Sequence, residues 1–218
     1  METTQKINEH LSPVFEEVLP AISNAGIKYW VFGGVGVAGI NGKYIRENQD
    51  IDIYVQEEDF WKLEPILKNL VEMHGAWDAD NWTLTYSMLK RHKRPKFALN
   101  IKKVERFEVT PVYRIPGGIE FRVTDPTTLS EDALIQEEKY LDGQQFFSAP
   151  ESVVKKLLKD IVEERIKNYN KTEHVKEDYK YVLDMRSLFP EDVVLDVIER
   201  FNKKADENKS GARDASGE

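Results

Sequence analysis

The chain has 218 residues, with 39 acidic against 31 basic side chains and no cysteine. This length predicts one domain with at most a small appendage. The lack of cysteine excludes disulfides, thiolate metal sites and cysteine nucleophiles. The four histidines, at positions 10, 74, 92 and 174, show no metal-ligand spacing. Any bound metal is therefore expected to be a hard divalent ion held by carboxylates.

The net charge of −8 disfavours nucleic acid and anionic membranes as general partners of the chain. Its longest apolar run, residues 30–40, is too short for a membrane span of about 20 residues. The N-terminus lacks the basic and apolar parts of a signal peptide. These features predict a cytoplasmic protein without a membrane partner, and they leave its oligomeric state unknown.

In chain order, the apolar pattern first predicts a helix over residues 13–25 with a kink at Pro20, then a buried strand over residues 27–32. Residues 49–55 alternate acidic and apolar side chains, as in a strand with one polar face. Residues 57–74 have the spacing of an amphipathic helix. Further strands are expected at residues 83–89, 97–101, 107–115 and 119–123, with a hairpin inside 133–147.

Beyond residue 148 the pattern becomes helical, with two further helices expected over residues 173–188 and 191–203. The last segment, residues 203–218, holds no Val, Ile, Leu, Met or aromatic residue, which predicts a disordered tail. The expected fold class is α/β (α+β). The expected organisation is a sheet domain in residues 1–148, a helical region in 149–202 and the tail.

The candidate site begins with a glycine pair and two aspartates. Gly33-Gly34 ends the first strand and opens a helix, so its backbone N–H groups can bind phosphate oxygens. Asp50 and Asp52 alternate along the next strand and point to one face, about 6–7 Å apart. Two carboxylates this close favour a divalent cation between them, and two such ions can clamp a phosphoryl transfer.

Two more side chains extend this site. Arg46 lies just before the aspartates, where its guanidinium can bind a triphosphate. A third acid is expected at Glu108, which is flanked by apolar residues as Asp52 is. Glu105 is the competing candidate, but strand parity assigns it to the opposite face and its surroundings are more charged.

These residues resemble the nucleotidyltransferases of the DNA polymerase β superfamily, and most closely those that modify aminoglycosides and lincosamides. The resemblance rests on Gly33-Gly34, on the segment RENQDIDI that contains Asp50 and Asp52, and on EVTPV beginning at Glu108. It covers roughly residues 27–115 and, more weakly, 150–185. The chain departs from the family in its third acid, which is usually Asp, and the longer Glu side chain can shift a metal or a base.

The resemblance implies a mixed β-sheet flanked by helices and a small helical C-terminal part. It also implies an NTP co-substrate and two Mg²⁺ ions on Asp50, Asp52 and Glu108. A lysine on a helix after the sheet would contact the phosphates, and Lys159 is the best match, with Lys155 as the alternative. The implied reaction transfers a nucleoside monophosphate to a hydroxyl of a small antibiotic-like acceptor and releases pyrophosphate.

Two alternatives remain open. The basic segment Lys90–Arg106 can bind RNA, as a toxin-type nucleotidyltransferase that modifies RNA or protein would require. The same segment is also consistent with a solvated hairpin between two strands. A non-catalytic module that binds nucleotide or RNA is the third interpretation.

Overall fold

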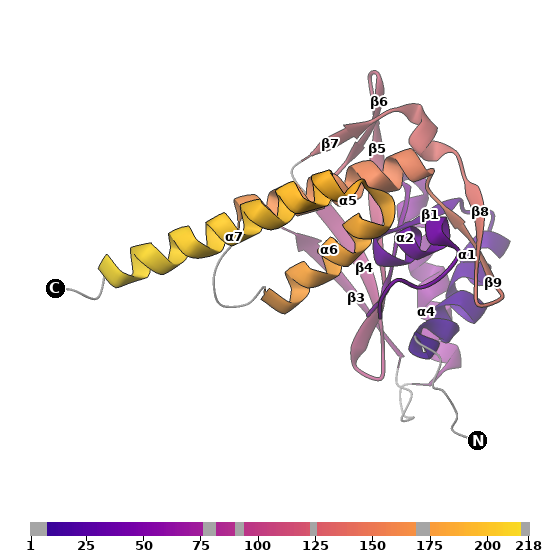
Figure 1. The fold of residues 1–218 in the computed structure, drawn as a ribbon. Coiled ribbons are helices and arrows are strands. Elements are labelled where there is room, and N and C mark those ends of the chain that lie inside the picture. Colours follow the sequence, from indigo (N-terminus) through magenta and orange to yellow (C-terminus); the bar gives the residue numbers. More distant parts are fainter. Residues whose placement is uncertain (1–7, 76–81, 90–93, 123–125, 169–174, 215–218) are drawn as a thin grey trace. The chain divides into compact units, whose positions relative to one another are not determined.

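The structure, a computed structural model, describes residues 8–75, 82–89, 94–122, 126–168 and 175–214 (Figure 1). The chain divides into two compact units, Met1–Val154 and Lys155–Glu218, and each unit is described by itself. The first unit contains the sheet and the second is helical. The predicted boundary after residue 148 precedes helix α5 (Glu151–Lys167), whereas the division between the compact units lies inside that helix.

The first unit is built on a nine-stranded mixed sheet, whose main path has the order β3-β4-β5-β2-β1-β9-β8. Strand β6 extends it from β5 and pairs with β7. Strands β2 and β5 are parallel, as are β1 and β9, while the hairpin pairs are antiparallel. The strands are β1 (Tyr29–Phe32), β2 (Ile51–Gln56), β3 (Trp82–Leu89), β4 (Arg94–Ile101), β5 (Val104–Ile115), β6 (Gly118–Phe121), β7 (Thr127–Leu129), β8 (Glu137–Leu141) and β9 (Gln144–Ser148).

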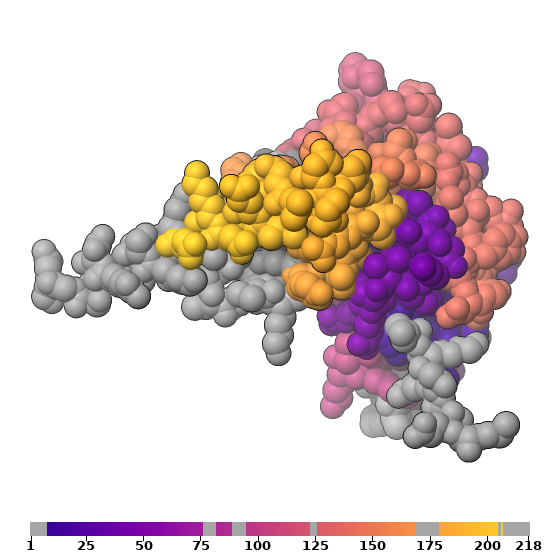
Figure 2. Space-filling view, in the orientation of Figure 1, coloured from indigo at the N-terminus to yellow at the C-terminus, as the bar shows by residue number. Residues whose placement is uncertain are grey.

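Helices and helical turns connect these strands. Helix α2 packs beside β8, and Figure 2 shows purple N-terminal residues next to salmon residues of the later sheet on one face of the molecule. The first unit contains η1 (Glu9–Leu11), η2 (Val14–Val18), α1 (Leu19–Asn24), α2 (Gly33–Asn41), α3 (Glu57–Phe60), α4 (Leu63–Met73) and η3 (Glu131–Leu134).

The sheet is buried on both faces in its central strands. On one face, Val31, Ile53 and Val109 belong to a core that includes Val14 and Leu67 from the flanking helical segments. Their burial follows from the alternation of side chains along β1, β2 and β5.

The other face carries a cluster of aromatic rings. Trp30 stacks on Tyr54 with ring centroids 5.2 Å apart, and Phe121 packs edge-on against Tyr54. The Tyr54 hydroxyl donates to the Ala133 carbonyl at 2.5 Å, and Trp30 Nε1 donates to Ile135 O at 3.1 Å. The segment around η3 therefore satisfies the polar ends of these rings, and burial raises the pKa of Tyr54.

Two details of the first unit refine the sequence-based expectations. The helix expected over residues 13–25 is divided at Leu19 into a π-helical turn and α1, with Pro20 in the first turn of α1. Proline lacks an N–H group, so it fits a helix start better than a helix interior. Strand β7 was not predicted, because its three residues are too few to show a period.

The second unit holds most of α5, together with α6 (Val175–Leu188) and α7 (Glu191–Asp214). The guanidinium of Arg200 in α7 forms a bidentate pair with Glu163 of α5, and this hydrogen-bonded pairing lowers the pKa of Glu163. None of the helices in the described part of the chain is long and apolar enough to span a bilayer.

The predicted tail over residues 203–218 differs from the structure, in which α7 continues to Asp214. The reason is that extending an existing helix needs no new nucleation, and this segment contains several good helix formers, such as Lys203, Lys204 and Ala205. Residues 215–218 lie outside the described residues.

Candidate active site

The turn between β1 and α2 is shaped by Gly33. Its φ of +64° lies in the left-handed region, which glycine adopts at little cost. A Cβ atom at this position would lie 2.6 Å from Oδ2 of Asp52, closer than real Cβ contacts allow. The absence of a side chain at Gly33 therefore lets the carboxylate of Asp52 lie directly against the start of α2.

Gly34, the second residue of α2, contacts a different pair of side chains. A Cβ atom at Gly34 would clash with the amide oxygen of Asn48 and with the guanidinium of Arg46. Arg46 and Asp52 are thus both held against the glycine pair. The structure brings together Gly33, Gly34, Arg46 and Asp52 as the sequence predicts, and Asp50 immediately precedes β2.

The segment that carries Arg46 and Asp50 is held by the N-terminal part of the chain. Asn8 Oδ1 accepts from the backbone N–H of Asn48 at 2.6 Å, and Asn8 Nδ2 donates to the Arg46 carbonyl at 3.2 Å. A ring nitrogen of His10 hydrogen-bonds the Asn48 carbonyl at 2.7 Å. Asn8 and Asn48 are both buried, so these bonds are shielded from water. No local pattern in the sequence indicates this contact, which joins residues about 40 positions apart.

The acids of β2 and β5 lie on one face of the sheet. Asp52 pairs with Phe32 of β1 on one side and with Glu108 of β5 on the other. Glu108 in turn pairs with Ala98 of β4. Paired residues on adjacent strands point to the same face, about 5 Å apart at their backbones. The structure therefore aligns Glu108 with Asp52, the position expected for the third acid.

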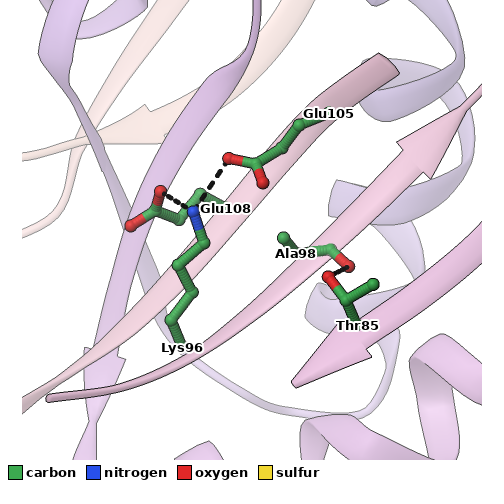
Figure 3. A network of polar contacts seen from close by, with 5 residues as sticks. All are labelled: Thr85, Lys96, Ala98, Glu105 and Glu108. Carbon is green, nitrogen blue, oxygen red and sulfur yellow. Dashed lines mark hydrogen bonds and ion pairs between the residues drawn. The ribbon is translucent and has the colours of Figure 1, made fainter. Parts of the chain in front are cut away.

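Lys96, a member of the basic segment, contacts this third acid. Lys96 Nζ lies 2.6 Å from Oε2 of Glu108 and 2.9 Å from Oε1 of Glu105 (Figure 3). Burial alone would lower the pKa of Lys96, but the two carboxylates outweigh it and hold that pKa above its ordinary value. Lys96 is therefore a fixed cation between two acids.

The prediction that Glu105 faces away from Glu108 is wrong. A β-bulge in the β4–β5 pairing shifts the register, so that Leu99 pairs with Phe107 while Asn100 pairs with Glu105. Arg106 is the extra residue, and its guanidinium donates to the Gln49 carbonyl at 2.9 Å. One inserted residue reverses strand parity, which places both glutamates within reach of Lys96.

The donor chemistry of the site suits a hard divalent cation, because aspartate and glutamate oxygens are the ligands that Mg²⁺ prefers. Asp52 supplies such oxygens directly against Gly33, and Asp50 lies two residues before it in the chain. Within the described residues, however, no three His, Cys, Asp or Glu side chains are arranged as a set of metal ligands. One carboxylate oxygen of Glu108 is engaged by Lys96 at 2.6 Å.

Much of the basic segment falls outside the described residues, including residues 90–93. Of its remaining members, Lys96 and Arg106 have the protein contacts given above, and Lys102 and Lys103 form the turn between β4 and β5. The hairpin predicted around Lys90–Lys96 falls between β3 and β4, which pair antiparallel up to Leu89 and Arg94, while its turn lies outside the described residues.

The two candidate phosphate-binding lysines lie on α5, in the second unit. Lys159 is exposed and close enough to Glu163 to contribute to the lowered pKa of that carboxyl. The ammonium of Lys155 lies 5.9 Å from the ring centre of Phe189. Contact of either lysine with a nucleotide stays a prediction.

The sequence profile of the aminoglycoside-2''-adenylyltransferase family matches residues 14–180, more than half of the chain. The chain belongs to this family. It is thereby a nucleotidyltransferase of the antibiotic-modifying type, which confirms the resemblance found on Gly33-Gly34 and the aspartates. No curated protein sequence matches the chain significantly.

Several solved structures share the fold at low sequence identity. ANT(2'')-Ia in complex with adenylyl-2''-tobramycin is 17% identical, with a TM-score of 0.56, over 89% of this chain and 98% of the other. The solution structure of ANT(2'')-Ia is 16% identical, with a TM-score of 0.55, over 99% and 96%. The lincosamide adenylyltransferase LnuA bound to lincomycin is 16% identical, with a TM-score of 0.52, over 84% and 99%. These likenesses support the predicted mixed sheet flanked by helices.

Proposed function

We propose that the chain transfers a nucleoside monophosphate from an NTP to a hydroxyl group of an aminoglycoside or lincosamide and releases pyrophosphate. The observation that carries this proposal is the in-register pair Asp52 and Glu108 beside the Gly33-Gly34 turn. Family membership and the names of the relatives support it, since those relatives are adenylyltransferases bound to tobramycin or lincomycin products and substrates. ATP is accordingly the first nucleotide to test.

The triphosphate would bind at the start of α2. The N–H groups at the beginning of a helix have no partners within it and favour anions. Arg46, held against Gly34, would add a permanently charged guanidinium that can bind two phosphate oxygens. Lys159 would contribute a further positive charge to the phosphates, with Lys155 as the alternative.

Asp50 and Asp52 would hold divalent metal, expected to be Mg²⁺, with Glu108 completing the acidic set. When bound, such an ion supplies charge neutralisation at the phosphate oxygens. Glu108 would also orient the acceptor hydroxyl and accept its proton. Its position in register with Asp52 puts both side chains on the same face of the sheet.

In the reaction, the acceptor oxygen would form a bond to the α-phosphorus as the bond from that phosphorus to the bridging oxygen breaks. The bridging oxygen leaves with pyrophosphate, and the acceptor proton passes to Glu108 or to water. No oxidant or reductant is needed. The protein mainly supplies positioning and charge stabilisation.

The first prediction concerns Asp52→Asn, which keeps the shape of the side chain but removes its charge. We expect turnover to fall by about 10³-fold or more, because the substituted amide is a poor ligand for a hard cation. Release of pyrophosphate from α-labelled ATP, measured across a panel of aminoglycosides and lincosamides, provides the assay. Asp196→Asn, at an exposed carboxylate in α7, is the matched control and should leave turnover unchanged.

Wild-type protein that releases no pyrophosphate with any acceptor and any of the four NTPs would contradict the proposed activity. Unchanged turnover in Asp52→Asn would instead contradict the role of that carboxylate. Including tRNA in the panel covers the toxin-type alternative, for which the described residues of the basic segment add no support.

A further inference from the structure

We propose that Lys96 serves as a built-in cation at the third carboxylate, so that the active site binds one divalent ion, at Asp50 and Asp52, in place of two. The inference rests on the proposed nucleotidyl transfer and specifies the charge arrangement of the same site. It makes Lys96 a positioning residue that acts through Glu108.

The geometry places the charge of Lys96 at Glu108. Its ammonium lies 2.6 Å from Glu108 Oε2, the distance of a direct charge-assisted hydrogen bond. The side chains of Lys96 and Glu108 are only 17% and 14% exposed, so water screens this pair weakly. A second metal ion at Glu108 would be repelled by the Lys96 ammonium unless it displaced that group from the carboxylate.

Asp52 and Glu108 place two acidic side chains on one face of the sheet, where they are adjacent on parallel strands. Their two carboxylates, when ionised, therefore repel each other. A hard metal ion between them is one solution, and an ammonium group on the far side of Glu108 is another. Lys96 provides the second solution without any bound ligand.

Glu105 makes the position of Lys96 more secure. The β-bulge at Arg106 brings Glu105 to 2.9 Å from the same ammonium, so Lys96 has two carboxylate partners. If Glu108 turns toward an acceptor hydroxyl, Lys96 keeps a counter-charge in Glu105.

Mn²⁺ binding tests this inference, because free Mn²⁺ gives an electron paramagnetic resonance signal that bound Mn²⁺ loses. We expect the wild-type chain to bind one Mn²⁺, and Lys96→Met to bind two, since it leaves Glu105 and Glu108 without their cation. Lys96→Arg should keep the stoichiometry at one. Lys68→Met, at an exposed lysine of α4, is the matched control and should also bind one.

Wild-type protein that binds two Mn²⁺, or Lys96→Met that still binds one, would overturn the inference while leaving the proposed function intact. Wild-type protein that binds no Mn²⁺ would also overturn the inference, and turnover measured separately tests the proposed function. If Lys96→Met does not fold, as judged by circular dichroism, Lys96→Gln provides the same test with a polar end group.

Kinetics give a second readout that a purely structural role would not produce. Lys96→Met should lower kcat by about 10- to 100-fold while the KM for ATP changes little, because the loss falls on Glu108 rather than on the triphosphate. Lys96→Arg should recover most of kcat. Equal losses in the methionine and arginine variants would contradict a role for the positive charge.

Discussion

The two strands that carry the acids position them by different physical means. Asp52 of β2 is placed by close packing, because Gly33 leaves no Cβ atom in the space that its carboxylate fills. Glu108 of β5 is placed by charge, because Lys96 binds its carboxylate at 2.6 Å. The first arrangement depends on the turn between β1 and α2, and the second depends on the register of the β4–β5 hairpin.

Because the two acids are held differently, the Gly33–Asp52 contact and the cluster of Lys96 with its glutamates should respond differently to substitution. Packing around Gly33 is intolerant of added volume, because an added Cβ would lie 2.6 Å from Oδ2 of Asp52. The Lys96 cluster is sensitive to loss of charge but can accept a change of shape, since long side chains adjust their rotamers. Three substitutions examine these expectations.

The largest effect is expected from Glu108→Gln, compared with Glu105→Gln. We expect the first to lower kcat by about 10²-fold or more and the second by less than about 10-fold. The physical reason is that Glu108 is in register with Asp52, whereas Glu105 pairs with Asn100 and supports the site only through Lys96. Pyrophosphate release measures both. A larger loss of kcat in Glu105→Gln than in Glu108→Gln would assign to Glu105 the role proposed for Glu108.

Gly33→Ala should break the packed half of the site. The φ of +64° and the 2.6 Å approach to Asp52 predict a loss of about 1–3 kcal/mol of unfolding free energy, together with reduced activity. Urea unfolding provides the stability measurement. Gly26→Ala is the matched control, because Gly26 also has a positive φ, +73°, but has nothing within 4 Å of an added Cβ. Equal losses of activity in Gly33→Ala and Gly26→Ala would contradict a specific role for the contact between Gly33 and Asp52.

A smaller effect is expected from Asn8→Ala, which removes the support of the Arg46–Asp50 segment. The buried N–H of Asn48 would lose its acceptor, at a cost of about 1–2 kcal/mol in unfolding free energy. The KM for ATP should rise, since Arg46 is carried by the same segment. Asn8→Asp keeps the acceptor and should retain most of the stability. An unchanged KM in Asn8→Ala would show that Arg46 does not depend on this support.

Much of the first half of the site could be predicted from the sequence. The Gly33-Gly34 turn, the strand that carries Asp52 and the following helix are local features, set by glycine, by alternation and by apolar spacing. Glu108 was also placed correctly beside Asp52, because apolar neighbours mark a strand whose acid points away from the core. Local chemistry was sufficient at these positions.

The role of Lys96 could not be predicted because the turn that sets the register of β4 and β5 lacks the residues that usually mark such a turn. Lys102 and Lys103 both adopt positive φ, 54° and 63°, as in a two-residue hairpin turn that usually contains Asn and Gly. Without that signal, the pairing of β4 with β5 was not apparent. The bulge at Arg106 then reversed the parity on which the placement of Glu105 depended.

The sequence by itself determined the family and the mixed sheet flanked by helices, since these follow from short-range patterns along the chain. Only the tertiary structure decided which cation accompanies the third acid and which residues secure Arg46. Those contacts join positions on different strands and an N-terminal segment, and their geometry depends on strand register. Register is a property of the assembled sheet, because one inserted residue changes the face on which every following side chain lies.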